Sequence, residues 1–109
     1  MEIVFRTKRL ARIFNTREAL VKAYGERQAR KIMKRISVLR AAADLSEVPT
    51  IRPDRCHALA GDRAGQYAVD LEHPYRLIFR PYTDAASSMP SASRGSVTSI
   101  EVLGVEDYH

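Results

Sequence analysis

The chain has 109 residues, a net charge of +5 and a single cysteine, Cys56. This length suits one domain with a small core, and we predict a single domain over residues 1–109. One cysteine excludes an intrachain disulfide framework and a zinc cluster built on cysteines. No apolar run approaches the roughly 18 residues of a membrane span, and the first residues lack a secretory signal pattern. We therefore expect a cytoplasmic protein with no membrane contact.

Positive charge is concentrated in the first part of the chain. Residues 1–40 hold 12 Lys/Arg against 3 Asp/Glu, whereas residues 41–109 hold 6 against 10. A basic half is typical of proteins that bind phosphate or an acidic protein, but it is equally typical of a solvated helix surface. The three histidines, at positions 57, 73 and 109, lack the short spacing of metal ligands. We expect neither a metal nor a cofactor.

The first half is predicted to be mostly helical. A β-branched and aromatic run at 2–6 predicts a strand, and residues 8–14 predict a short helical turn. Asn15 and Glu18 have the spacing of a capping box and mark a helix start, and Gly25 either ends that helix or interrupts it. Apolar residues then recur at three- and four-residue steps, which predicts an amphipathic helix packed on a core. These residues are Ala29, Ile32, Met33, Ile36, Leu39 and Ala43.

The second half changes to the two-residue period of strands. The predicted strands are 56–60, 66–71, 76–81 and 97–105, with a loop at 49–53 and turns at 61–65 and 72–74. The Ser/Ala-rich residues 83–95 predict a flexible loop. Helices followed by closely connected strands predict an α+β fold, in which an N-terminal strand and two helices pack on a small antiparallel sheet.

Two stretches of the second half resemble a known toxin family. The first is HALAGDRAGQYAVDLEHPYRLIFRP at 57–81, with a His-x-Leu-x-Gly-Asp-Arg turn, an aromatic strand and an Arg-hydrophobic-x-Phe strand. The second is the ending Glu106-Asp107-Tyr108-His109. In this order they resemble the HigB-type "plasmid maintenance killer" branch of the RelE/ParE toxin superfamily. The resemblance covers residues 55–109.

This resemblance implies a small α+β toxin that cleaves messenger RNA on the translating ribosome. It also implies a silencing antitoxin, usually encoded beside the toxin and expected to be a small helix-turn-helix protein. Catalysis would fall to His57, Asp107, Tyr108 and His109, with Arg76 at the family's basic position. Further basic residues would bind RNA phosphates, namely Arg55, Arg63, Arg80, Lys8, Arg9 and Arg12. The chain departs from the family at Ala60, where many relatives have a lysine, and in the longer 83–95 loop.

The residue types suit metal-free RNA cleavage, which needs a base for the ribose 2′-OH, donors for the charged phosphate and an acid for the leaving 5′-oxygen. The unperturbed pKa of histidine, about 6.5, lies near working pH, and arginine donates two parallel hydrogen bonds to phosphate. Negative charge at Glu106 and Asp107 favours protonated His109, and so favours it as the acid. His57 would be its partner. Tyr108 would contact the phosphate or stack on a base, and Asp107 would orient an imidazole or an arginine.

Each candidate residue also has an ordinary structural interpretation. A terminal tripeptide is often frayed, and a histidine in a strand is often structural. Arg76 and Arg80 share one strand face, where they either lie in solvent or pair with Glu101 across a sheet. Arg63 either pairs with Asp62 or lies in solvent. The alternative function is a non-enzymatic protein on the same scaffold that acts by binding, as ParE-like relatives are thought to act on gyrase. Ala60 keeps this alternative open.

Overall fold

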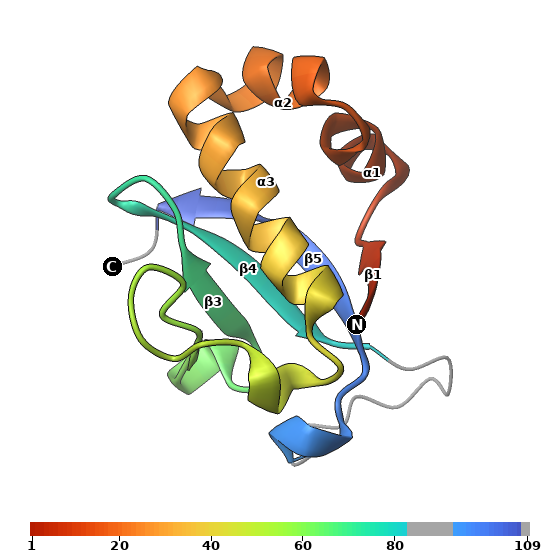
Figure 1. Cartoon of the computed structure of the whole chain (residues 1–109), viewed down its shortest axis with the longest axis vertical. Coiled ribbons are helices and arrows are strands. Elements are labelled where there is room, and N and C mark those ends of the chain that lie inside the picture. The colour runs from red at the N-terminus through yellow and green to blue at the C-terminus, as the bar shows by residue number, and fades with distance from the viewer. Residues whose placement is uncertain (83–92, 108–109) are drawn as a thin grey trace.

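Helices cover one face of a five-stranded sheet (Figure 1). The structure is a computed structural model that describes residues 1–82 and 93–107. The strands are β1 Glu2–Phe5, β2 His57–Ala58, β3 Tyr67–Asp70, β4 Tyr75–Pro81 and β5 Ser99–Asp107. The α-helices are α1 Lys8–Asn15, α2 Arg17–Tyr24 and α3 Glu26–Ala41, and short 3-10 turns lie at Leu45–Glu47, Gly61–Arg63 and Arg94–Ser96. The predicted α+β class is confirmed.

The strands lie in the order β1-β5-β4-β3-β2. Strands β2 to β5 form the predicted antiparallel meander, whereas β1 pairs with β5 in parallel at the edge opposite β2. In the described ranges, three α-helices and three strands lie between β1 and β5 in the chain, so local patterning does not fix the direction in which β1 and β5 pair. A bulge in β5 opposite Ile78 and Phe79 contains Gly104, whose φ of 149° favours glycine.

The helix boundaries differ slightly from those predicted. Thr16 starts α2, because its Oγ1 accepts a hydrogen bond from the backbone N–H of Ala19 at 3.1 Å. Asn15 is instead the last residue of α1, so the predicted start was wrong by one position; threonine is also a preferred cap. Gly25, with a φ of 86°, lies between α2 and α3, which confirms that it ends a helix.

The main core lies between α3 and the sheet. It includes Ala29, Ile32 and Leu39 of α3 and Val69, Leu77, Phe79 and Val102 of the sheet. Met33 is 41% exposed and Ala43 is also exposed, so the prediction that they pack on the core was wrong. Arg35, only 5% exposed, lies on the buried side instead. The helical period places Ile32 and Arg35 on one face and Met33 beside that face. A prediction from hydrophobicity alone therefore assigned Met33 to the core and left Arg35 out of it.

The segments around the strands are mostly as predicted. The loop at 49–53 and the turns at 61–65 and 72–74 are present. The predicted strand at 56–60 is shorter and comprises only β2. Most of the predicted loop at 83–95 lies outside the described residues. Within the described ranges, none of the helices combines the length and hydropathy needed to cross a bilayer.

A smaller apolar cluster marks the sheet face away from α3. It contains Leu59, Ala68 and Ile78, with Leu103 packed against it. Successive residues of a strand point to opposite faces, so Asp70 of β3 and Arg76 of β4 share this second face with Ala68 and Ile78. The polar residues of the candidate site gather on this face, at the end of the sheet where β3 turns into β4. Figure 1 shows the position of this hairpin.

Candidate functional site

A row of alternating charge crosses the sheet beside the β3–β4 hairpin. Asp70 on β3 is opposite Arg76 on β4, which is opposite Glu106 on β5. Arg55 extends the row through its ion pair with Asp70, and Arg63 extends it at the other end through its ion pair with Glu106. We call these five residues the charged row. Its three arginines outnumber its two carboxylates, so the row keeps a small excess of positive charge.

Asp70 holds two of these arginines. Nε and Nη2 of Arg55 donate to the Asp70 carboxylate at 2.7 and 3.0 Å, and Nε of Arg76 donates to it at 3.2 Å. Burial raises the pKa of Asp70, but hydrogen bonds and charge from Arg55, with the charges of Arg76 and His57, outweigh burial and hold the pKa below its ordinary value. The same hydrogen bonds raise the pKa of Arg55. Asp70 therefore stays ionised at neutral pH and keeps two guanidinium groups together.

The backbone at Arg55 supports this arrangement. Arg55 has a φ of 46°, a left-handed conformation that residues other than glycine rarely adopt. Its N–H donates to the carbonyl oxygen of Ile51 at 2.9 Å, and the N–H of Asp70 donates to the carbonyl oxygen of Asp54 at 2.9 Å. These bonds hold the loop before β2 against the end of β3, and they aim Arg55 at the Asp70 carboxylate.

His57 lies on β2, half-buried and opposite Ala68 of β3. Its Nδ1 is 2.8 Å from the carbonyl oxygen of Arg55. A carbonyl oxygen only accepts hydrogen bonds, so this contact requires the proton on Nδ1, and in the neutral ring the lone pair then lies on Nε2. His57 can therefore accept a proton at Nε2, on the sheet face that carries the charged row.

The other end of the row joins the Gly-Asp-Arg turn to the last strand. Nη1 and Nη2 of Arg63 donate to the two carboxylate oxygens of Glu106, both at 2.8 Å. Nε of Arg63 donates to Oε1 of Gln66 at 2.9 Å. The sequence suggested Asp62 as the partner of Arg63, whereas in the structure Arg63 pairs with Glu106. A two-point arginine–carboxylate contact fixes direction as well as distance, so the turn and β5 hold each other in place.

Arg35 supports the site from below, on the α3 side of the sheet. Its Nε donates to the carbonyl oxygen of Asp70 at 2.6 Å and its Nη2 to that of Pro53 at 3.1 Å. Its Nη1 lies 3.6 Å from Oδ1 of Asp54, which is 6% exposed. One buried guanidinium thus links α3 to the loop that carries Arg55 and to the strand that carries Asp70.

A cleft of about 550 Å³ opens beside the charged row, between α3, the loop at 52–55 and the β3–β4 hairpin. We call it the basic cleft. It is lined by Lys31, Arg35, Arg52, Pro53, Arg55, Asp70, Leu71, Glu72, His73 and Arg76. Five of these side chains are lysine or arginine and two are carboxylates. The excess of positive charge suits an anionic group such as a phosphate.

The structure brings together only some of the residues predicted from sequence. His57, Arg55, Arg63 and Arg76 gather on one sheet face. Arg80 pairs with Glu101 at 2.7 Å, which confirms its structural interpretation. It lies four residues along β4 from Arg76, about 13 Å away at the rise of a strand.

The remaining predicted residues are placed elsewhere or are not described. Lys8, Arg9 and Arg12 lie on α1, which contacts β1 and α2 at the edge of the sheet opposite β2. Asp107 ends β5 opposite Tyr75. Tyr108 and His109 lie outside the described residues. In the described part of the chain, no group of three or more His, Cys, Asp or Glu side chains is arranged to hold a metal ion.

Sequence reasoning missed three residues of the site. Asp70 and Arg35 were assigned no role, and Glu106 was expected only to favour protonated His109, not to pair with Arg63. A signal for Asp70 existed, since it lies on the polar side of a predicted strand and a tight turn separates it from Arg76. No comparable signal marks Arg35, which is one of many basic residues on a basic helix.

Comparison with known proteins identifies the fold. No protein-family model and no curated protein matches the chain. Among solved structures, a YoeB/ParE toxin from Agrobacterium tumefaciens is similar over 100% of both chains, with a TM-score of 0.58 and 16% sequence identity. At this identity the likeness establishes a shared fold.

Proposed function

We propose that this chain is the toxin of a toxin–antitoxin system, related to the HigB-type branch of the RelE/ParE superfamily, and that it cleaves messenger RNA on the translating ribosome without a metal. The observation that carries the proposal is the position of His57, with a proton-accepting Nε2, on the same sheet face as three arginines of the charged row. The fold shared with a YoeB/ParE toxin supports the toxin assignment.

The proposed reaction uses the basic cleft to bind the RNA backbone. Arg55 donates its Nε proton and one Nη2 proton to Asp70, and a guanidinium has five N–H donors in all. Its remaining donors, with the charge of Arg76, would bind the scissile phosphate and stabilise the charge that develops on it. Asp70 would not touch the RNA; it would be a positioning residue that keeps both arginines at the cleft.

The proton transfers follow from the two histidines. The 2′-oxygen forms a bond to phosphorus while its proton moves to Nε2 of His57. The bond from phosphorus to the 5′-oxygen breaks, and that oxygen takes a proton from His109, which leaves a 2′,3′-cyclic phosphate and a 5′-hydroxyl. Tyr108 would contact the phosphate or stack on a base, and Asp107 would orient one of the charged side chains. Ribosomal RNA would be bound by basic residues outside the cleft, Lys8, Arg9 and Arg12 of α1 among them.

Cleavage is tested by expressing the chain with and without active translation and mapping the ends of cellular messages. Wild type should produce new 5′-hydroxyl ends only during translation. His57→Ala and His109→Ala should each lower the cleavage rate by about 10²–10⁴-fold. The proposal fails if wild type produces no new ends, or if both variants cleave as wild type does.

A second candidate function is a non-enzymatic toxin that acts by binding a protein. Two observations favour it: Asp70 and Glu106 already pair with the arginines of the charged row, and Ala60 stands where many relatives have a lysine. Growth inhibition separates the two candidates. A binding toxin should still inhibit growth after His57→Ala and His109→Ala, whereas a nuclease should not.

Under either function we expect an antitoxin as partner, a small helix-turn-helix protein encoded by the adjacent reading frame. A toxin that acts on translating ribosomes would work in the cytoplasm. The sequence of the adjacent reading frame is therefore a direct check on the proposal.

A further inference from the structure

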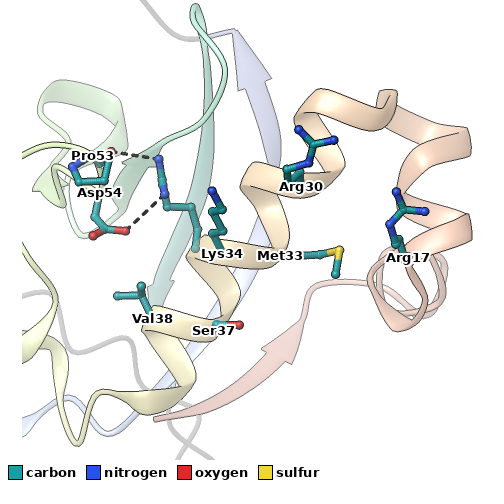
Figure 2. A pocket seen from close by; sticks show the side chains of 9 residues that line it. Arg17, Arg30, Met33, Lys34, Ser37, Val38, Pro53 and Asp54 are labelled. Carbon is teal, nitrogen blue, oxygen red and sulfur yellow. Dashed lines mark hydrogen bonds and ion pairs between the residues drawn. The ribbon is translucent and has the colours of Figure 1, made fainter.

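A second hollow lies on the exposed side of α3 and contains no residue of the charged row. It has a volume of about 600 Å³ and runs from the start of α2 across α3 to residues 53–54. Met33, Val38 and Pro53 give it an apolar floor, and Arg17, Arg30 and Lys34 line its rim. We call it the α3 groove. Figure 2 shows Met33 pointing from α3 toward the part of α2 that carries Arg17.

The apolar floor is exposed in the isolated chain. Met33 is one of the large hydrophobic side chains that the fold leaves open to solvent, at 41% exposure. Methionine is unbranched and polarizable, so it adapts to differently shaped apolar partners. An exposed methionine in a groove ringed by polar groups is typical of a contact surface for another protein.

The basic rim is available to new anionic partners. Arg17 and Arg30 both approach Glu26, at 3.3 and 3.8 Å, with side chains that are 54–63% exposed. Ion pairs this exposed contribute little to stability, so both arginines can turn to a carboxylate of a partner. Lys34 has no ion pair with any of the described residues. The rim thus offers three positive charges around an apolar floor.

We propose that the α3 groove binds an acidic, amphipathic segment of a partner protein. Apolar side chains of that segment would pack on Met33, Val38 and Pro53, while its carboxylates would pair with Arg17, Arg30 and Lys34. The identity of the partner rests on the proposed function, under which it is the antitoxin. The groove would then be a docking surface that adjoins the basic cleft, with which it shares Arg35 and Pro53.

Two other occupants fit the groove less well. An RNA backbone matches the positive rim but leaves the apolar floor uncovered. Among the described residues, no aromatic side chain lines the groove for a base to stack on. A second copy of this chain would bring its own basic half, with 12 Lys/Arg against 3 Asp/Glu in residues 1–40, to a basic rim. Like charges oppose that contact. An acidic segment with apolar side chains satisfies both the floor and the rim.

The test measures binding of the full chain to the purified product of the adjacent reading frame by calorimetry. Met33→Ala removes a floor contact, and Lys34→Glu reverses a rim charge; each should weaken binding by about tenfold or more. Arg40→Glu is the matched control, since it makes the same charge change on an exposed position of α3 outside the groove. It should change the dissociation constant by less than about threefold, because a solvent-exposed charge outside the groove makes no contact with the bound segment and is screened by salt. Circular dichroism establishes that each variant is folded.

The outcomes separate this inference from the proposed function. Met33→Ala should cleave messages as wild type does when no partner is present. If wild type does not cleave but Met33→Ala and Lys34→Glu still weaken partner binding, the nuclease proposal fails and the docking surface stands. If wild type does not bind the protein, or if the double variant Met33→Ala/Lys34→Glu binds as tightly as wild type, the docking surface is wrong. It is also wrong if a short single-stranded RNA binds in a manner that depends on Met33, since the groove is then a nucleic-acid site.

Discussion

Arg63 and Glu106 form a two-point ion pair, with both N···O distances at 2.8 Å, although the two residues are 43 positions apart in the chain. Arg63 closes the Gly-Asp-Arg turn, and Glu106 begins the Glu-Asp-Tyr-His ending. The two stretches that carry the family resemblance therefore meet in space, next to Arg76. The pair fixes Glu106, the first residue of this ending, in its place on β5 beside Arg76.

Glu106→Gln tests the importance of this pair. Because the two side chains are 27% and 39% exposed, its stability cost should be at most about 1 kcal/mol, equivalent to a fall in Tm of about 4–8 °C for a domain of this size. Cleavage should fall further than this loss of stability accounts for, since the start of the ending is no longer fixed. Thermal unfolding followed by circular dichroism and the cleavage assay measure the two effects. The control is Glu26→Gln. The side chains of Arg17 and Glu26, which form its ion pair, are 54% and 63% exposed, so this substitution should change neither the Tm nor the cleavage rate appreciably. Equal effects of the two variants would contradict the prediction.

Asp70→Asn should make stability less dependent on pH. At pH 7 the variant should lose about 1–2 kcal/mol, because the carboxylate no longer pairs with Arg55 and Arg76. The pKa of Asp70 is lower in the folded chain than its ordinary value of about 3.9. Its stabilisation is therefore fully present above the unfolded pKa and is lost as pH falls through the folded pKa.

The measurement is the free energy of unfolding in urea at pH 7, 5 and 3. The difference between wild type and Asp70→Asn should be the same at pH 7 and pH 5 and should shrink at pH 3. Asp62→Asn is the control, because Asp62 is exposed in its turn and makes no ion pair with the described residues. A difference for Asp70→Asn that grows on acidification would show that Asp70 is not held ionised by the two arginines.

The fold was predictable from sequence because most of it depends on local periodicity. The apolar steps through Ile32 and Leu39 mark the helix that covers the sheet, and the alternation in 66–71 and 76–81 marks strands joined by a tight turn. The parallel pairing of β1 with β5 was not predictable in this way, because residues 2–5 contact residues 99–102 through a connection that no local pattern describes.

The candidate site was only partly predictable, for a related reason. His57 and Arg76 were identified because they belong to recognisable motifs. Asp70 and Glu106 are recognised only once strand register places them on either side of Arg76. Arg35 shows the limit most clearly, since it resembles its neighbours on a basic helix and is distinguished only by burial and by its bonds to Asp70 and Pro53.

Replacement of Arg35 should lower the free energy of unfolding more than replacement of Asp54. Arg35→Met leaves the carboxylate of Asp54 buried without a compensating charge and also removes the bonds to the carbonyl oxygens of Asp70 and Pro53. We expect a loss of about 3–5 kcal/mol. Asp54→Asn removes the ion pair at 3.6 Å, in which Oδ1 of Asp54 makes no hydrogen bond. The Arg35 guanidinium keeps its hydrogen bonds to the carbonyl oxygens of Asp70 and Pro53, so this substitution should cost less, about 1–2 kcal/mol.

Urea unfolding of the two single variants and of Arg35→Met/Asp54→Leu gives the measurement. The double variant should recover part of the loss of Arg35→Met, because no buried charge is left unpaired. The network described here is wrong if Asp54→Asn proves more damaging than Arg35→Met.

Alanine substitutions at two neighbouring residues of α3 should have very different effects on stability. Ile32 is 0% exposed and packs in the main core, whereas Met33 is 41% exposed on the floor of the α3 groove. Ile32→Ala opens a cavity and should lower the free energy of unfolding by about 2–5 kcal/mol. Met33→Ala should change it by less than about 0.5 kcal/mol, as is usual for exposed positions. Chemical denaturation of both variants measures these values, and a large loss for Met33→Ala would mean that the helix is rotated from the orientation described here, so that the groove has no apolar floor.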